Sequence, residues 1–184
     1  MRIIGGRWRG LHLADVGRGD PAAHLRPTSD RVREAIFNLL INGGYGDPVT
    51  GARVLDLFAG TGALGLEALS RGALALTLVD DGVVARGLIA RNLALCKVEA
   101  VHLRLDATRL GVNKGPGFDL VFLDPPYGKA LGEAALTAAQ AGGWLAAEAL
   151  VVWEESAAVV APPGFDPLDQ RRYGETTVTI LRAP

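Results

Sequence analysis

VLDLFAGTGALGLEALSRGA, residues 54–73, decides the fold of this chain. It begins with the apolar run of a buried strand, passes through a glycine turn and continues as an apolar helix. Gly60, Gly62 and Gly65 have the G-x-G-x-x-G spacing of a turn that lets the backbone approach a ligand at a strand's carboxyl end. The spacing does not name the ligand, because a dinucleotide and S-adenosylmethionine both carry an adenosine ribose.

The alternation of strands and helices continues downstream of this stretch. It indicates an α/β fold, a mostly parallel sheet with helices on both faces. We predict strands at 52–58, 74–80, 100–106, 117–124, 148–155 and 176–183. We predict helices at 63–72, 82–96 and 129–142.

The segment upstream of residue 52 has a different pattern. Residues 4–13 alternate in a way that favours a hairpin, and residues 16–30 have the Gly, Pro, Asp and Ser content of a loop. Thr28, Ser29 and Asp30 are candidate N-caps for a helix at about 31–41. The apolar stripe of that helix would be Val32, Ala35, Ile36, Leu39 and Leu40.

Composition excludes several classes of protein. The chain has 184 residues, 49% of them hydrophobic and 21% charged, which suits one globular domain with a short appendage. No apolar run approaches the roughly 18 residues of a membrane span, and the N-terminus lacks a signal-peptide core, so we expect a cytoplasmic protein. Cys96 is the one cysteine and the three histidines are scattered, so we expect a buried, apolar Cys96 and no metal site.

Charge is distributed unevenly along the chain. The formal net charge is −1, but residues 1–33 hold seven arginines against three acids, and the remainder holds 12 basic against 17 acidic residues. This asymmetry favours an anionic partner at the N-terminal end, and a merely solvated arm is the alternative.

Three acids lie at the ends of successive predicted strands, and together they favour a cationic ligand. Asp80 lies about twenty residues beyond the glycine turn, where a ribose-binding acid is expected. Asp56 lies just before the turn, where a carboxylate is unfavourable beside a diphosphate and favourable beside the sulfonium and ammonium of S-adenosylmethionine. Asp56 could instead bind the amides of the turn. Asp106 could accept from an adenine amino group or cap the turn that follows it.

FDLVFLDPPYG, residues 118–128, is the more specific motif. The predicted strand ends at Asp124, and Pro125 and Pro126 then make a rigid turn that ends on the aromatic ring of Tyr127. This set suits methylation of an exocyclic amino group on a planar base. Asp124 and the Pro125 carbonyl would accept hydrogen bonds from the amino hydrogens, and Tyr127 would stack on a base removed from its own stack.

These motifs resemble the RsmD-type bacterial 16S rRNA (guanine-N2)-methyltransferase family over nearly the whole chain. Residues 1–10, MRIIGGRWRG, and residues 25–40, LRPTSDRVREAIFNLL, resemble its N-terminal segments, and GGWL and YGE resemble its C-terminal landmarks. The resemblance implies a Rossmann-like class I S-adenosylmethionine-dependent methyltransferase fold with a seven-stranded sheet and a short N-terminal extension. Asp81 and Gly82 depart from the pattern, which expects a basic or polar residue and then a helix former.

The resemblance also implies site residues. The catalytic turn would be Asp124, Pro125, Pro126 and Tyr127. The cofactor pocket would include Asp56, Phe58, Gly60, Gly62, Asp80 and Asp106. RNA would be contacted by Arg2, Arg7, Trp8, Arg9, Arg26, Arg31 and Arg33, of which Arg31 and Arg33 could instead only form salt bridges.

The sequence therefore predicts an N-terminal hairpin and helix at 1–50 that contacts RNA, and a methyltransferase domain at 51–184. The predicted function is methyl transfer to a guanine N2 of 16S rRNA, in a 30S subunit or an assembly intermediate. We expect no metal, no membrane and no obligate protein partner. The alternatives are an adenine-N6 DNA or RNA methyltransferase and a non-catalytic RNA-binding module with the same fold; a dehydrogenase is disfavoured because no hydride-transfer acid or substrate arginine is recognisable.

Overall fold

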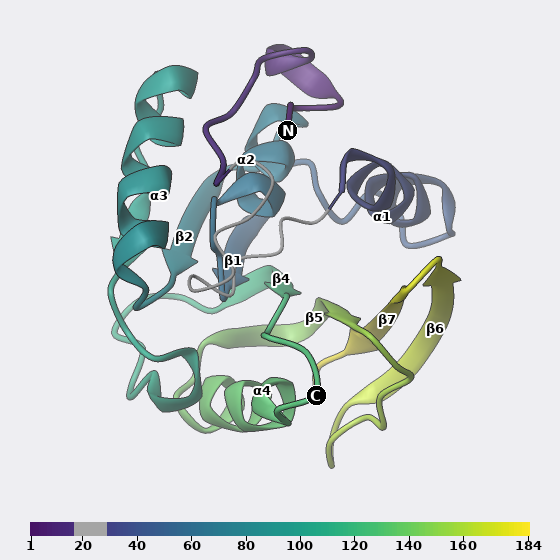
Figure 1. The fold of residues 1–184 in the computed structure, drawn as a ribbon. Helices are drawn as coiled ribbons and strands as arrows, with labels where there is room; N and C mark the ends of the chain where they lie inside the picture. The colour runs from purple at the N-terminus through teal and green to yellow at the C-terminus, as the bar shows by residue number, and fades with distance from the viewer. Residues whose placement is uncertain (17–28) are drawn as a thin grey trace.

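The computed structural model describes residues 1–16 and 29–184 of the chain (Figure 1). Its central element is a seven-stranded sheet in the order β3-β2-β1-β4-β5-β7-β6. Strands β1 to β5 run parallel to one another, whereas β7 is antiparallel to both β5 and β6. The strand order reverses between β1 and β4, and such a switch point is where open α/β sheets bind ligands.

The elements follow the predicted alternation closely. The strands are β1 Arg53–Leu57, β2 Ala75–Val79, β3 Val101–Leu103, β4 Phe118–Leu123, β5 Leu145–Glu155, β6 Asp166–Tyr173 and β7 Thr176–Arg182. The α-helices are α1 Asp30–Asn42, α2 Ala63–Ser70, α3 Val83–Cys96 and α4 Leu131–Ala141. Two short 3-10 helices are η1 Gly6–Trp8 and η2 Ala107–Arg109.

Helices cover both faces of the sheet, as the sequence predicts. One core contains side chains from α1, α2 and α3 and from alternate positions of the strands. Helix α4 covers the other face (Figure 1). The second core lies there and contains Ala135, Leu136 and Ala139 of that helix. Cys96 ends α3 and is 3% exposed, which confirms its predicted apolar role.

The seventh strand, β6, was missing from the strands predicted by residue pattern. Its sequence, DPLDQRRY, has no apolar alternation because it is the edge strand and most of its side chains are exposed. It forms a hairpin with β7 through Gly174, whose φ of 65° suits a glycine. A strand without a buried face leaves no periodic signal in the sequence.

The N-terminal segment forms an irregular hairpin beside α2 (Figure 1). The amide of Ile3 donates to the Leu11 carbonyl (2.9 Å) and the amide of Leu13 to the Met1 carbonyl (3.1 Å), with η1 between them. Ile3 and Leu13 are buried in the same core as α1. The extension is therefore packed onto the sheet domain rather than held apart from it.

Helix α1 begins one residue earlier and ends one residue later than predicted. Ser29 is its N-cap, and its side chain accepts from the Val32 amide (3.2 Å). Of the predicted stripe, Ile36 and Leu40 are fully buried, together with Phe37, which the pattern did not include. Candidate N-cap Thr28 lies outside the described residues.

Candidate active site

Two turns face each other across the switch point of the sheet. β1 ends at Leu57 and β4 ends at Leu123, and these two residues are in register on neighbouring parallel strands. The amide of Asp124 donates to the Leu57 carbonyl (3.4 Å). The glycine turn after β1 and the Asp124–Tyr127 turn after β4 therefore lie side by side at one edge of the sheet.

The glycine turn has a backbone that depends on its glycines. Gly60 and Gly62 have φ of 56° and 76°, and Gly62 is the left-handed N-cap of α2. Phe58 also has a positive φ, 59°, which is uncommon for an aromatic residue and marks the turn as constrained. Gly65 lets α2 approach β2, since a Cβ there would lie 2.4 Å from Leu76 Cδ1.

Asp80 lies at this turn, as the sequence predicts. Its Oδ2 accepts from the Gly60 amide and its Oδ1 from the Gly82 amide, both at 2.8 Å. Gly82 is the N-cap of α3, so the unusual Asp81-Gly82 pair still leads directly into a helix. One half-buried carboxylate thus links the turn after β1 to the start of α3.

Asp56 binds an amide of the glycine turn, which is the second of the two roles expected for it. Its side chain is 1% exposed, and Oδ2 accepts from the Gly65 amide (2.9 Å). Burial raises the pKa of Asp56 to about 8; the Gly65 hydrogen bond opposes this rise, and the nearby Asp80 adds to it. The carboxyl therefore stabilises the glycine turn through this hydrogen bond and has little exposed surface for direct contact with a ligand.

Asp106 also adopts its second arrangement, that of a cap. It is the N-cap of η2, and its Oδ1 accepts from the amide (2.8 Å) and the hydroxyl (2.7 Å) of Thr108. These bonds, with the Thr108 side-chain bond the larger cause, lower the pKa of Asp106. The residue stands after β3, the outer strand of the parallel part of the sheet.

The charges at the glycine turn fit a cation better than a diphosphate. Two acids, Asp56 and Asp80, lie at the turn, and among the described residues neither forms a salt bridge. Burial is the main cause of the raised pKa of Asp56, and the charge of Asp80 adds to it, so the half-buried Asp80 is the acid of the pair that a ligand would meet. A sulfonium or ammonium group beside the Asp80 carboxylate would be attracted, whereas phosphates would be repelled.

The Asp124–Tyr127 turn is fixed by residues of β5 and β7. Pro125 is buried and Tyr127 is half-buried. The Tyr127 hydroxyl donates to Glu154 Oε1 (2.9 Å) and lies 3.3 Å from Thr176 Oγ1. Burial, and then the charge of Glu154, raise the pKa of Tyr127 well above its usual range, so the hydroxyl remains a donor.

Glu154 and Glu155 are site residues that the sequence analysis did not identify. Glu155 accepts from the Gly128 amide (3.3 Å), directly after the tyrosine. The sequence held a signal for them, because both acids lie at the end of the predicted strand 148–155. The predicted strand before it ends in Asp124. The same argument selected Asp56, Asp80 and Asp106.

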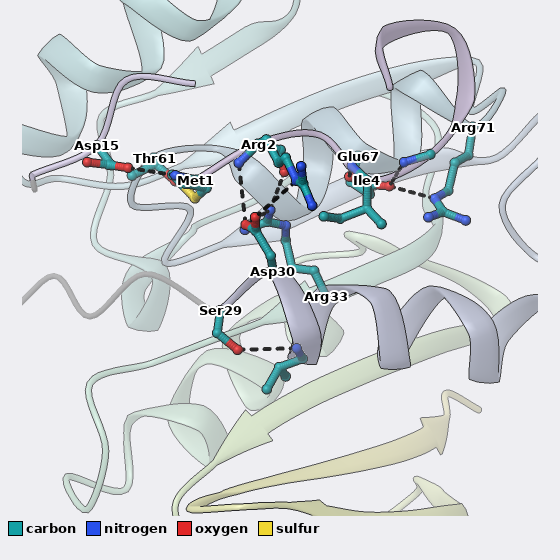
Figure 2. A network of polar contacts seen from close by, with 12 residues as sticks. Met1, Arg2, Ile4, Asp15, Ser29, Asp30, Arg33, Thr61, Glu67 and Arg71 are labelled. Carbon is teal, nitrogen blue, oxygen red and sulfur yellow. Dashed lines mark hydrogen bonds and ion pairs between the residues drawn. The ribbon is translucent and has the colours of Figure 1, made fainter. Parts of the chain in front are cut away.

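Polar contacts fasten the N-terminal arm, residues 1–16, onto α2 and α3. Buried Glu67 accepts from the amides of Ile4 (2.7 Å) and Gly5 (2.8 Å) and from Arg71 Nε (2.7 Å) (Figure 2). Buried Asn92 donates to the carbonyls of Ala14 (3.0 Å) and of Thr61 in the glycine turn (2.9 Å). The arm is therefore held next to the glycine turn.

The predicted RNA-contacting residues differ in their exposure. Arg7, Arg9 and Arg31 are exposed, and the Arg7 guanidinium lies 4.1 Å from the centroid of the partly buried Trp8 ring. Arg2 is 60% exposed and pairs with Asp30 (3.6 Å). Arg26 lies outside the described residues.

Arg33 requires a correction. Its side chain is 0% exposed, and its Nη2 donates to Asp30 Oδ1 (2.8 Å) and to the Arg2 carbonyl (Figure 2). A guanidinium without exposed surface has no access to a phosphate. Arg33 is a structural residue that joins the arm to α1, as its salt-bridge alternative predicted.

Two further properties concern the described residues as a whole. Within residues 1–16 and 29–184, no three His, Cys, Asp or Glu side chains gather where they could hold a metal ion. None of the helices in the described part of the chain has the length and apolar character needed to cross a membrane.

Comparison with known proteins gives consistent matches over nearly the whole chain. A family model described as "Conserved hypothetical protein 95" matches residues 1–182. The sequence is 43% identical over 156 residues to the ribosomal RNA small subunit methyltransferase D of Escherichia coli, covering 84% of this chain and 74% of that protein. It is 36% identical to the putative rRNA methyltransferase YlbH of Bacillus subtilis, covering 99% of this chain and 98% of that protein.

Solved structures match the fold as well. The putative methyltransferase yhhF from Escherichia coli superposes with a TM-score of 0.83 at 36% identity, over 100% of this chain and 97% of that one. The putative methylase HI0767 from Haemophilus influenzae has a TM-score of 0.76 at 29% identity, over 98% and 97% of the two chains.

Proposed function

This chain belongs to the family described as Conserved hypothetical protein 95, the RsmD family, and we propose that it is a methyltransferase of small-subunit ribosomal RNA that acts on a guanine N2 of 16S rRNA. The proposed substrate is the rRNA within a 30S subunit or an assembly intermediate in the cytoplasm. The Escherichia coli relative is named as a methyltransferase of small-subunit ribosomal RNA.

One observation carries the proposal: a DPPY turn lies beside a glycine turn across the switch point of the sheet. Leu57 and Leu123 are in register, so the residues that follow them emerge next to each other. A methyl donor held by the first turn and a base held by the second would meet at this edge.

S-adenosylmethionine is the proposed cofactor. It would supply an electrophilic methyl group on a sulfonium, so the transfer needs no metal. The proposed pocket consists of Asp56, Phe58, Gly60, Gly62, Asp80 and Asp106. Asp80 would exchange one of its two amide hydrogen bonds for a hydrogen bond from the ribose. Asp56 would act indirectly, by holding the Gly65 amide of the glycine turn.

Asp124 to Tyr127 are proposed to activate the amino group. Its lone pair is delocalised into the ring, so the nitrogen is a poor nucleophile. The Asp124 carboxylate and the Pro125 carbonyl would accept one hydrogen bond each from the two amino hydrogens, favouring a pyramidal nitrogen. Tyr127 would stack on the base, a contact of about 1–3 kcal/mol that offsets part of the cost of removing the base from its stack.

The arm and the segment that leads into α1 are proposed to bind the RNA backbone. Arg7, Arg9 and Arg31 present exposed guanidinium groups, and Arg2 is largely exposed. Trp8, stacked under Arg7, would contact a loop base. Arg26 stays in the predicted set, while Arg33 leaves it because it is buried.

The test is methyl transfer from labelled S-adenosylmethionine to small ribosomal subunits from a strain that lacks this protein, with duplex DNA in parallel. N2-methylguanosine in 16S rRNA is the expected product. N6-methyladenine in DNA or RNA would overturn the assignment of the base. Cofactor binding without any label in either substrate would indicate a non-catalytic RNA-binding module.

A further inference from the structure

The ring of Tyr127 is held at its far end by a polar socket. Glu154 is near the carboxyl end of β5 and Thr176 is the first residue of β7, and both side-chain oxygens lie within 3.3 Å of the tyrosine hydroxyl. These strands pair antiparallel, with Glu154 opposite Val178. The socket is thus built on the rigid sheet and not on a loop.

The burial of Glu154 opposes folding unless its carboxylate is satisfied by hydrogen bonds. Glu154 is 4% exposed and lies on the same face of the sheet as the buried apolar residues Val152 and Val178. Burying a carboxylate is unfavourable unless hydrogen bonds satisfy it. A hydrogen bond from a phenol to a carboxylate is among the stronger kinds, and here it joins the sheet to the catalytic turn.

The socket restricts the orientations that the Tyr127 ring can adopt. A tyrosine side chain has two rotatable bonds, and holding its hydroxyl fixes the direction of the ring axis. Because a phenol O–H lies in the plane of the ring, its hydrogen bond to Glu154 also restricts rotation of the ring about that axis. Glu155 holds the next amide, that of Gly128, and the Leu57 carbonyl holds the amide of Asp124 at the other end of the turn. Tyr127 as a residue is only half-buried, so it is not enclosed by the sheet.

We propose that Glu154 is a positioning residue for methyl transfer, which holds the Tyr127 ring as a preformed platform for the target base. This inference rests on the function proposed above. A ring that is already oriented loses little rotamer freedom when the base stacks on it, so the socket raises affinity for the extruded base without touching it.

The experiment compares Y127F, E154A, E154Q and the double variant Y127F/E154A in steady-state methylation of small subunits. Loss of a hydrogen bond to a charged group is expected to lower kcat/KM for RNA about tenfold in Y127F and in E154A. The double variant should lose no more than either single one, because both remove the same contact. E154Q retains an acceptor and should stay within about threefold of wild type.

Two controls separate positioning from folding. The affinity for S-adenosylmethionine should change less than about twofold in each variant, since the socket is not in the cofactor turn. T177V alters a buried threonine of β7 opposite Glu155 and should leave kcat/KM unchanged. Should E154A fail to fold, Y127F and E154Q decide the question between them.

The outcomes are distinct. Y127F with wild-type kcat/KM overturns the proposal, and so do losses in Y127F and E154A that add in the double variant. Failure of the wild-type protein to methylate guanine in rRNA would instead overturn the function on which the proposal rests.

Discussion

Replacing Asp56 with Asn should abolish a pH dependence of stability that the buried carboxyl creates. Burial raises the pKa of Asp56 from 3.8 to about 8. A raised pKa means that the folded protein keeps a proton which the unfolded chain releases. The contribution to stability is therefore fully present below about pH 4 and is lost as the pH rises through about 8. Asn has the same shape, stays neutral and can still accept from the Gly65 amide.

The size of the effect follows from the shift. About four pKa units, at about 1.4 kcal/mol each, correspond to at most about 6 kcal/mol. About 4 kcal/mol of this lies between about pH 5 and pH 9, and relaxation that brings water to the ionised carboxylate reduces it, so we expect wild type to lose about 2–4 kcal/mol relative to D56N over that range. All other titrating groups are shared by the two proteins and cancel in the difference.

The assay is urea unfolding of both proteins, without cofactor, at about one-unit steps across that range. D81N is the matched control, because Asp81 is an exposed acid near the same turn and its curve should run parallel to that of wild type. A difference between wild type and D56N that stays constant from about pH 5 to pH 9 would refute the reasoning, since the carboxyl would then be ionised throughout.

Three further predictions concern the catalytic turn, the arm and its anchor. D124A should lower the rate of methyl transfer about 10²–10³-fold while cofactor affinity, measured by calorimetry, stays near wild type; unimpaired turnover would exclude its role. R7A/R9A should weaken RNA binding and flatten the salt dependence of Kd, and an unchanged slope would mean that these arginines do not contact phosphate. E67A should lower the free energy of unfolding by about 3–5 kcal/mol in urea, against a change within about 0.5 kcal/mol for exposed E133A.

The sequence predicts the sheet and the two turns because their signals are local. VLDLF and LVFL are buried on both faces and therefore read as continuous apolar runs, and glycine spacing marks the backbone of the turn. Strand β6 leaves no such signal, since its pairing with β7 rests on backbone hydrogen bonds at an exposed edge. Strand β3, at the other edge of the sheet, is also shorter than predicted and spans only Val101–Leu103.

Side-chain partners were harder to predict than positions. Asp56, Asp80 and Asp106 all stand at strand ends, as expected, but only the structure distinguishes them: two bind amides of the glycine turn and the third caps η2. Exposure is the other missing quantity. Arg31 and Arg33 are two residues apart on one helix, yet one is exposed and the other is 0% exposed.

The burial of Arg33 and Glu67 changes how the N-terminal arm should be understood. A division of the chain at residue 50 treats the arm as an appendage that carries positive charge. Its buried polar contacts instead run to α1 through Arg33, to α2 through Glu67 and to the glycine turn through Asn92. Removing any of these partners leaves buried polar groups unpaired, which costs more than the loss of one surface contact. The exposed arginines of the arm therefore stand on a backbone that is fixed relative to the Asp124–Tyr127 turn, so RNA bound by them would be placed by the same fold that brings the two turns together.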